Sequence, residues 1–241
     1  MIETTIDSAC LFDPIIVGEK LRAIAFAHDC ARHPLFDYLD KTPLSKAQIA
    51  SFLANYDAHA SLLRRLLLKA ATLMPEEAVG YILENVRNEY GNGNPDHRHQ
   101  LQLFDLGIKA GVEVSDLKHE TIMSGVADYI SIVPNFYFPE NSDHPKDLIK
   151  PAIAAGAITA TEILAIEEFR HMQNSFRYLS LEHHIWFDHV TVECEHSEES
   201  VALALFFAKD EIGLESVLYG LNSVLDANMH LYSGLLEAAK T

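Results

Sequence analysis

"HVTVECEH", residues 189–196, decides how the fold is read, because it can be interpreted as a strand or as a helix. Its β-branched residues favour a strand, but a strand would place His189 and His196 on opposite faces. In a helix, which turns about 100° per residue, Glu193 and His196 lie within about 40° of His189 around the axis. We predict a helix, because the run has no turn signal, its flanks look helical and no second strand is available for pairing.

Helical periodicity extends from this stretch over most of the chain. Apolar residues recur at three- and four-residue steps, separated by proline, glycine and N-cap signals. The pattern predicts an all-α bundle of about seven or eight helices in a single domain, residues 1–241. The expected helices cover residues 14–33, 45–74, 75–90, from 95 onward, 115–133, 147–179, the His-rich segment to 210, and 215–240, with a loop at 134–145.

Composition limits the classes of partner. The 241 residues are 49% hydrophobic, which is enough for a substantial core. A formal net charge of -17 repels phosphate backbones, so we expect no nucleic-acid partner. No run reaches the roughly 18 apolar residues of a membrane span, and the N-terminus lacks the order of a signal peptide. We therefore expect a cytoplasmic protein with no membrane partner and, with three scattered cysteines, free thiols.

The acidic chain also contains 13 histidines, and imidazole with carboxylate is the ligand set of iron, zinc and manganese sites. If residues 189–196 are helical, His189, Glu193 and His196 form one stripe and are candidate metal ligands. Scattered histidines and glutamates on an exposed helix would give the same pattern, so this motif alone leaves both interpretations open.

A metal site in a helical bundle takes further ligands from facing helices. In NEYGNGNPDHRHQ, residues 88–100, Glu89 ends one predicted helix and His99 lies in the first turns of the next. The tight Gly/Pro break between them could bring both side chains to one place, although a helix corner needs no ligands.

A second source of ligands is GAITATEILAIEEF, residues 156–169. Glu162 is embedded there among apolar residues, where a carboxylate is costly unless it is paired or coordinated. Glu167 and Glu168 are alternatives, although their position resembles an ordinary exposed face. We prefer Glu162.

In this order, the three segments resemble the heme-oxygenase-like di-iron oxidases, in particular the CADD-like group of iron-containing redox enzymes. The resemblance implies a heme-oxygenase-like bundle of the TenA/PqqC type that binds two non-heme Fe ions and activates O2 to oxidise a small organic substrate. Carried over by position, the metal ligands would be Glu89, His99, Glu162, His189, Glu193 and His196.

The chain departs from the family pattern in three places, one of which is the spacing from Glu162 to His189, which is shorter than usual in the family. The carboxylate of an earlier helix has no clean counterpart, and Asp57 and His59 are the alternatives for a further ligand. Thr161 stands where CADD-like proteins carry a tyrosine before the ligand glutamate, so we do not expect a self-sacrificing tyrosine at this position.

Other functions fit parts of the sequence. A cofactorless or thiaminase-like enzyme of the same fold is one rival, and a non-catalytic helical interaction protein is another. The sequence does not name the substrate, does not separate iron from manganese or zinc, and leaves the oligomeric state open, with a homodimer as one arrangement such bundles adopt.

Overall fold

The computed structural model describes residues 12–117, 121–141 and 143–241, and for residues 141, 189 and 191–195 it describes the backbone alone. Within these ranges no strand is present, and the helix predicted over residues 189–196 is confirmed as the start of α9. Nine α-helices of eight residues or more lie in the described part of the chain, against about seven or eight expected. The α-helices are α1 (Pro14–Ala27), α2 (Pro34–Lys41), α3 (Lys46–Ala71), α4 (Gly80–Glu89), α5 (His99–Lys109), α6 (Ser124–Ile132), α7 (Pro134–Tyr137), α8 (Lys150–Ser175), α9 (His189–Phe207) and α10 (Glu211–Lys240).

Two helix starts follow directly from capping chemistry. The Asp13 carboxylate accepts a hydrogen bond from the backbone N–H of Ile15 at 2.9 Å, with Pro14 at the first helical position of α1. At α3, Ser45 and Gln48 form a reciprocal capping box. Both starts were predicted from the same signals.

The first predicted helix, residues 14–33, is shorter in the structure. It ends at Ala27 because His28 adopts an extended backbone, and the His28 ring accepts a hydrogen bond from Cys30 N, which starts a 3₁₀ turn instead. Pro34 then opens α2, a helix that the sequence analysis did not assign.

Three further boundaries differ from expectation. The helix predicted from residue 75 begins at Gly80 after a series of turns, and the one predicted from residue 95 is a 3₁₀ turn followed by α5. The range 115–133 is helical only from Ser124. The helices are present in the predicted segments, but each α-helix begins several residues later than predicted.

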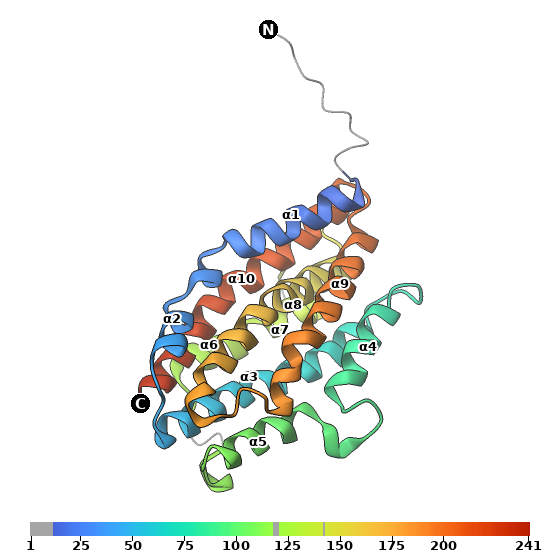
Figure 1. Ribbon diagram of the computed structural model, residues 1–241. Coiled ribbons are helices and arrows are strands. Elements are labelled where there is room, and N and C mark those ends of the chain that lie inside the picture. Colours follow the sequence, from blue (N-terminus) through green and yellow to red (C-terminus); the bar gives the residue numbers. More distant parts are fainter. Residues whose placement is uncertain (1–11, 118–120, 142) are drawn as a thin grey trace.

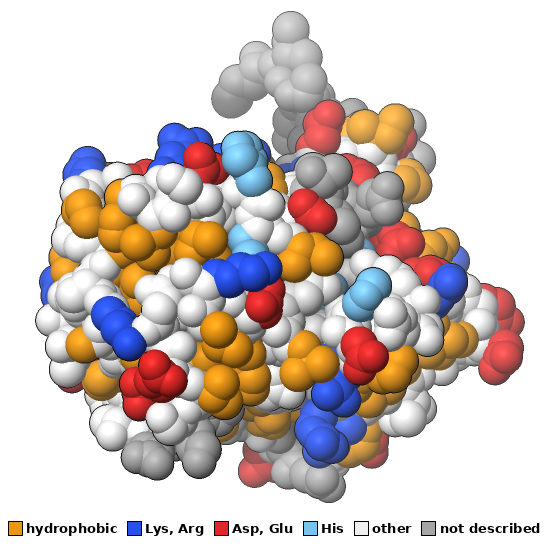
Figure 2. Space-filling view, turned by 60° about the horizontal axis from the view of Figure 1, so that its bottom comes forward, with side chains coloured by type: hydrophobic (Ala, Val, Ile, Leu, Met, Phe, Trp, Pro, Cys, Tyr) orange, Lys and Arg blue, Asp and Glu red, His pale blue; other side chains and the backbone are white. Residues whose placement is uncertain are grey.

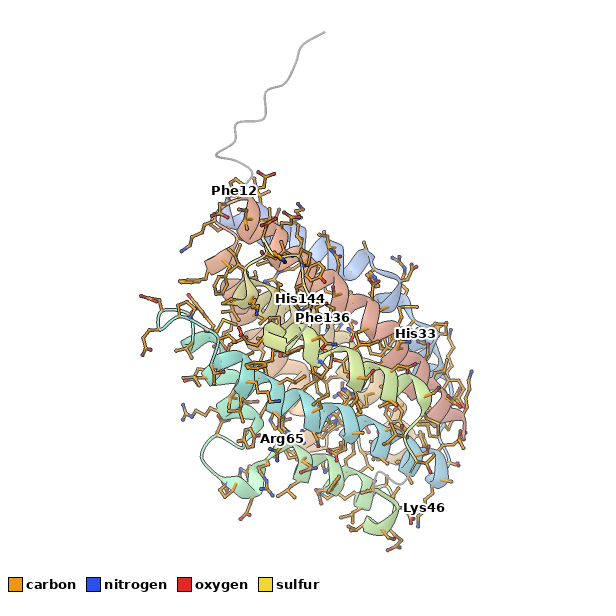
Figure 3. All side chains as sticks on the ribbon, turned by 180° about the vertical axis from the view of Figure 1, so that it is seen from behind. Phe12, His33, Lys46, Arg65, Phe136 and His144 are labelled. Carbon is orange, nitrogen blue, oxygen red and sulfur yellow. The ribbon has the colours of Figure 1, made fainter. Side chains whose placement is uncertain are left out.

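The loop predicted at residues 134–145 contains a single-turn α7 and a 3₁₀ turn. It lies against α10, because the His144 ring packs 5.6 Å from the Phe136 ring and 5.7 Å from the Tyr219 ring (Figure 3). Pro134 at the first helical position pre-sets the backbone for the short helix.

Helix α8 lies in the middle of the bundle and packs against α10, α9 and α2 (Figure 1). Residues 152–160 of α8 are all buried and are mostly Ala, Ile and Gly. A Cβ atom on Gly156 would lie 1.9 Å from the Val217 carbonyl oxygen, and one on Gly220 would lie 2.0 Å from that of Ile153. These glycines let the two helices approach closely. The close contact restrains α8, and the polar residues of its second half are therefore held in place.

Charge is mixed on one face of the molecule despite the net value. Figure 2 shows acidic, basic and apolar side chains interleaved on one face, so no field of a single sign covers it. In the ranges that the structure describes, no helix combines the length and apolar character that crossing a membrane requires.

Candidate metal centre

A cavity of about 80 Å³ lies between α3, α8 and α10 and is closed by single residues from α4, α5, α6, α7 and the turn before α9. Most of its wall is aromatic or aliphatic. Its ionisable lining residues are His59, Arg64, Glu89, His99, Glu162 and Glu168, together with four tyrosines, Tyr56, Tyr129, Tyr137 and Tyr232. Three residues predicted as metal ligands, Glu89, His99 and Glu162, thus lie on the wall of one cavity.

Glu89 and His99 meet across the Gly/Asn/Pro corner between α4 and α5. His99 Nδ1 lies 3.0 Å from Glu89 Oε1, with both side chains largely buried. The corner depends on Gly91, which has a φ of 86° and whose Cβ would lie 2.2 Å from the Asn94 carbonyl oxygen. Gly91 therefore allows the tight corner that brings the Glu89 and His99 side chains together.

Glu162 and His196 form a second pair, of which Glu162 lines the cavity and His196 is buried beside it. Glu162 Oε1 accepts a hydrogen bond of 2.8 Å from Asn85 Nδ2, and His196 Nδ1 lies 4.0 Å from Glu162 Oε2. Glu162 and His196 are both buried, although α8 and α9 are separated by a long connection. Asn85 was not singled out from the sequence, because an Asn in the middle of an amphipathic helix carries no signal of a distant partner.

His189 and Glu193 lie outside the residues whose side chains the structure describes. The backbone of α9 is helical from His189 onward, so positions 189, 193 and 196 share one side of that helix. Among the described side chains, no group of three His, Cys, Asp or Glu residues is close enough together to hold a metal ion. His189 and Glu193 stay predicted ligands.

The donor set suits non-heme iron chemically. Carboxylate oxygens and imidazole nitrogens are the protein ligands of such sites, and here they come from α4, α5, α8 and α9. Buried Glu162 would also gain from a cation, because a hydrogen bond from a neutral amide offsets only part of the cost of burying a charge.

The structure separates the two alternatives for a further ligand. The Asp57 carboxylate accepts hydrogen bonds from Ser61 Oγ at 2.9 Å and from Gln100 Nε2 at 3.0 Å, and it lies 3.6 Å from Arg64 Nη2. Asp57 does not line the cavity, whereas His59 does. The network around Asp57 explains why an Asp is buried in α3 without contributing to the cavity.

His59 is 3% exposed, and in the described part of the chain neither of its ring nitrogens has a hydrogen-bond partner. Its ring packs edge-on against Tyr56, with centroids 4.7 Å apart. Burial lowers the pKa of His59 to about 3, so this imidazole is neutral at physiological pH.

Glu167 and Glu168, the alternatives to Glu162, point in different directions. Glu167 pairs with Arg170 on the outer face of α8. Glu168 lines the cavity, where its carboxylate accepts a hydrogen bond of 2.8 Å from Tyr56 Oη and a further one from Tyr232. Burial raises the pKa of the Glu168 carboxyl. Among the described side chains, Glu162 is the one of the three that lies beside a predicted histidine ligand, His196.

Thr161 joins two buried tyrosines to the same wall. Tyr137 Oη donates to Thr161 Oγ1 at 2.8 Å, and Tyr129 also hydrogen-bonds to Thr161. Burial raises the pKa of both phenols. These tyrosines come from α6 and α7, and their contact with α8 was not predicted, because the packing of the bundle decides which distant residues they meet.

Comparisons with known proteins agree with this architecture. A family model described as "iron-containing redox enzyme" matches residues 51–229. A CADD-like protein of unknown function from Nostoc punctiforme PCC 73102 superposes with a TM-score of 0.73 at 18% identity, covering 95% of this chain and 99% of that one. A TenA homolog from Pseudomonas syringae pv. tomato DC3000 superposes with a TM-score of 0.54 at 14% identity, covering 94% and 91%. No curated protein matches the chain.

At these identities, the structural likenesses establish the fold alone. The predicted all-α, heme-oxygenase-like architecture is confirmed by both neighbours.

Proposed function

The chain belongs to the iron-containing redox enzyme family, and from that premise we propose that it is a non-heme di-iron oxidase that uses O2 to oxidise a small organic substrate. One observation carries the proposal. Two Glu–His pairs, Glu89 with His99 and Glu162 with His196, come from four different helices. Three of these side chains line one cavity, and His196 is buried beside Glu162.

In this proposal the six ligands are Glu89, His99, Glu162, His189, Glu193 and His196. Two bound iron ions would bind O2 and relay to it electrons taken from the substrate. The charge of the cavity supports cation binding, because three glutamates line it and its one arginine, Arg64, already lies beside Asp57.

The protein's own contribution would be to orient the ligands and exclude water. Asn85 fixes one oxygen of Glu162 and leaves the other directed toward His196. Trp186 and Phe169, with ring centroids 5.5 Å apart, form an apolar part of the wall that keeps bulk water from the substrate.

The proposal is tested by anaerobic titration with Fe(II), followed by absorbance spectroscopy after O2 is admitted. We expect two irons per chain and an O2-dependent transient band in the wild type, both lost in His99→Ala. His183→Ala is the matched control, because its side chain is 92% exposed. Parallel titrations with Mn(II) and Zn(II) compare the metals. Failure of the wild type to bind iron would overturn the proposal and favour an interaction protein.

The TenA neighbour raises a second candidate, a thiaminase-like enzyme, which would need a nucleophilic cysteine in the cavity. No cysteine is found among the described residues of the cavity wall. Cys30 is buried away from that wall, and its burial raises the pKa of the thiol to about 12. Cys194 is not described beyond its backbone, so Cys194→Ser is the direct test. Loss of a thiaminase activity in that variant, without iron binding, would favour the rival.

A further inference from the structure

The cavity has a second polar region that the proposed ligands do not use. Glu168 lies six residues after Glu162 on α8, which is about 9 Å along the helix axis. Its carboxylate receives hydrogen bonds from the phenols of Tyr56 and Tyr232. Glu168 is thus held in place by α3 and α10, and it faces the cavity apart from Glu162 and its histidine.

In the described part of the chain, no cation accompanies Glu168. Its hydrogen-bonding neighbours are the two phenols, and the cavity wall contains no lysine. The one arginine of the wall, Arg64, donates to Ser61 at 2.8 Å and lies 3.6 Å from Asp57. A buried carboxylate with neutral partners alone is costly, and a cationic ligand would offset that cost.

Aromatic rings surround this region. The Tyr56 ring packs edge-on against Trp186, with centroids 6.0 Å apart, and against His59 at 4.7 Å. Aromatic faces attract ammonium groups, most strongly where water is excluded. His59 adds two ring nitrogens without hydrogen-bond partners among the described residues, and a neutral imidazole offers one donor and one acceptor.

We propose that Glu168, with Tyr56 and His59, forms a subsite for the protonated amino group of a small primary amine. Glu168 takes the charge, the Tyr56 ring contacts the ammonium group or the adjacent methylenes, and His59 hydrogen-bonds a second polar substituent. The inference rests on the proposed function, because it names the substrate class of the same cavity. It assigns no bond-making step to these residues.

The test is calorimetric titration of the full chain with n-butylammonium, n-butanol and pentanoate. These probes share their apolar length and differ in the charge of the head group. We expect the ammonium to bind at least tenfold more tightly than the other two, with and without bound Fe(II) under anaerobic conditions. Glu168→Gln should remove that preference, and Glu167→Gln, on the outer face of the same helix, should retain it.

Three results would overturn the inference: equal affinity for ammonium and alcohol, a preference that survives Glu168→Gln, or no binding of any probe. An amine that binds only with iron and is insensitive to Glu168→Gln would be a metal ligand, and it counts against the subsite. If Glu168→Gln fails to fold, the wild-type preference still decides.

Iron stoichiometry, measured on the same samples, keeps the two proposals apart. Two irons without ammonium preference overturn the subsite alone, and ammonium preference without iron overturns the oxidase proposal alone.

Discussion

The two halves of α8 differ in what they contact. Residues 152–160 are fully buried, and around Gly156 and Gly220 they form a closely packed seam against α10. The second half of the helix, from Thr161 onward, presents Glu162 and Glu168 to the cavity. The same helix thus combines close packing with buried charge on consecutive turns. The seam fixes the axis of α8, and this is what holds the two carboxylates in position about 9 Å apart along it.

Gly156→Ala should have the largest effect, because it breaks the seam. The added Cβ would lie 1.9 Å from a backbone oxygen of α10, which cannot move without separating the helices. We expect destabilisation by about 3 kcal/mol or more, despite the better helix propensity of alanine. Urea unfolding measures it. Gly80→Ala is the matched control, since no atom lies within 4 Å of its Cβ, and it should be neutral or slightly stabilising. Equal stability of both variants would disprove the role of the seam.

Glu162→Gln should have the next largest effect. We expect it to weaken iron binding while leaving the stability of the fold nearly unchanged, unlike Gly156→Ala. The Gln oxygen can still accept from Asn85, so we expect the metal-free protein to keep its stability within about 1 kcal/mol. Loss of a charged ligand should weaken Fe(II) binding by about 100-fold or more. Anaerobic iron titration and thermal unfolding are the measurements. A variant that binds iron normally would remove Glu162 from the ligand set.

His59→Phe tests the α3 wall of the cavity through the pH dependence of stability. Unfolded His59 is protonated below pH 6.5, whereas in the folded chain its pKa is lowered to about 3 by burial. The unfolded state therefore binds the extra proton, and stability falls as pH decreases from 6.5 toward 3, by up to about 1.4 kcal/mol per pH unit from this group. Urea unfolding of the metal-free protein at pH 7 and 5.5 should show a smaller loss in His59→Phe. An identical loss of stability in both proteins would mean that groups other than His59 cause the pH dependence.

Glu167→Gln should have the smallest effect. The side chain lies on the outer face of the cavity half, in an ion pair with Arg170 that is substantially exposed on both sides. We expect a change in unfolding free energy of less than about 0.5 kcal/mol, and unchanged iron binding. Chemical denaturation and iron titration check this. A large loss of iron binding would show that a residue on the outer face of α8 also affects the metal site, so that the face of the helix does not decide function.

Much of the fold was predictable because its signals are local. Asp13 and Ser45 identify helix starts, and the glycines of the α4–α5 corner correctly suggested that Glu89 and His99 meet. The α2 helix was missed because its eight residues carry too short a pattern to read.

The second polar region was not predictable in the same way. Glu168 has the sequence surroundings of an exposed glutamate, and its burial depends on Tyr56 and Tyr232, which lie on other helices. Asn85 likewise gained its significance only through Glu162, 77 positions later. Local patterns describe the helix on which a residue lies, and the packing of the bundle decides which distant side chain it meets.

The corner between α4 and α5 has a kinetic consequence. Residues 92–98 are exposed and lie between Glu89 and His99, whereas the seam of α8 is fully buried. Amide hydrogens of residues 152–160 should therefore exchange with solvent only through global unfolding, and those of the corner through fast local opening. Hydrogen exchange can measure both rates. Under the oxidase proposal, metal would enter and leave where the amides exchange fastest, so stiffening the corner would slow iron uptake without changing how tightly iron is finally held.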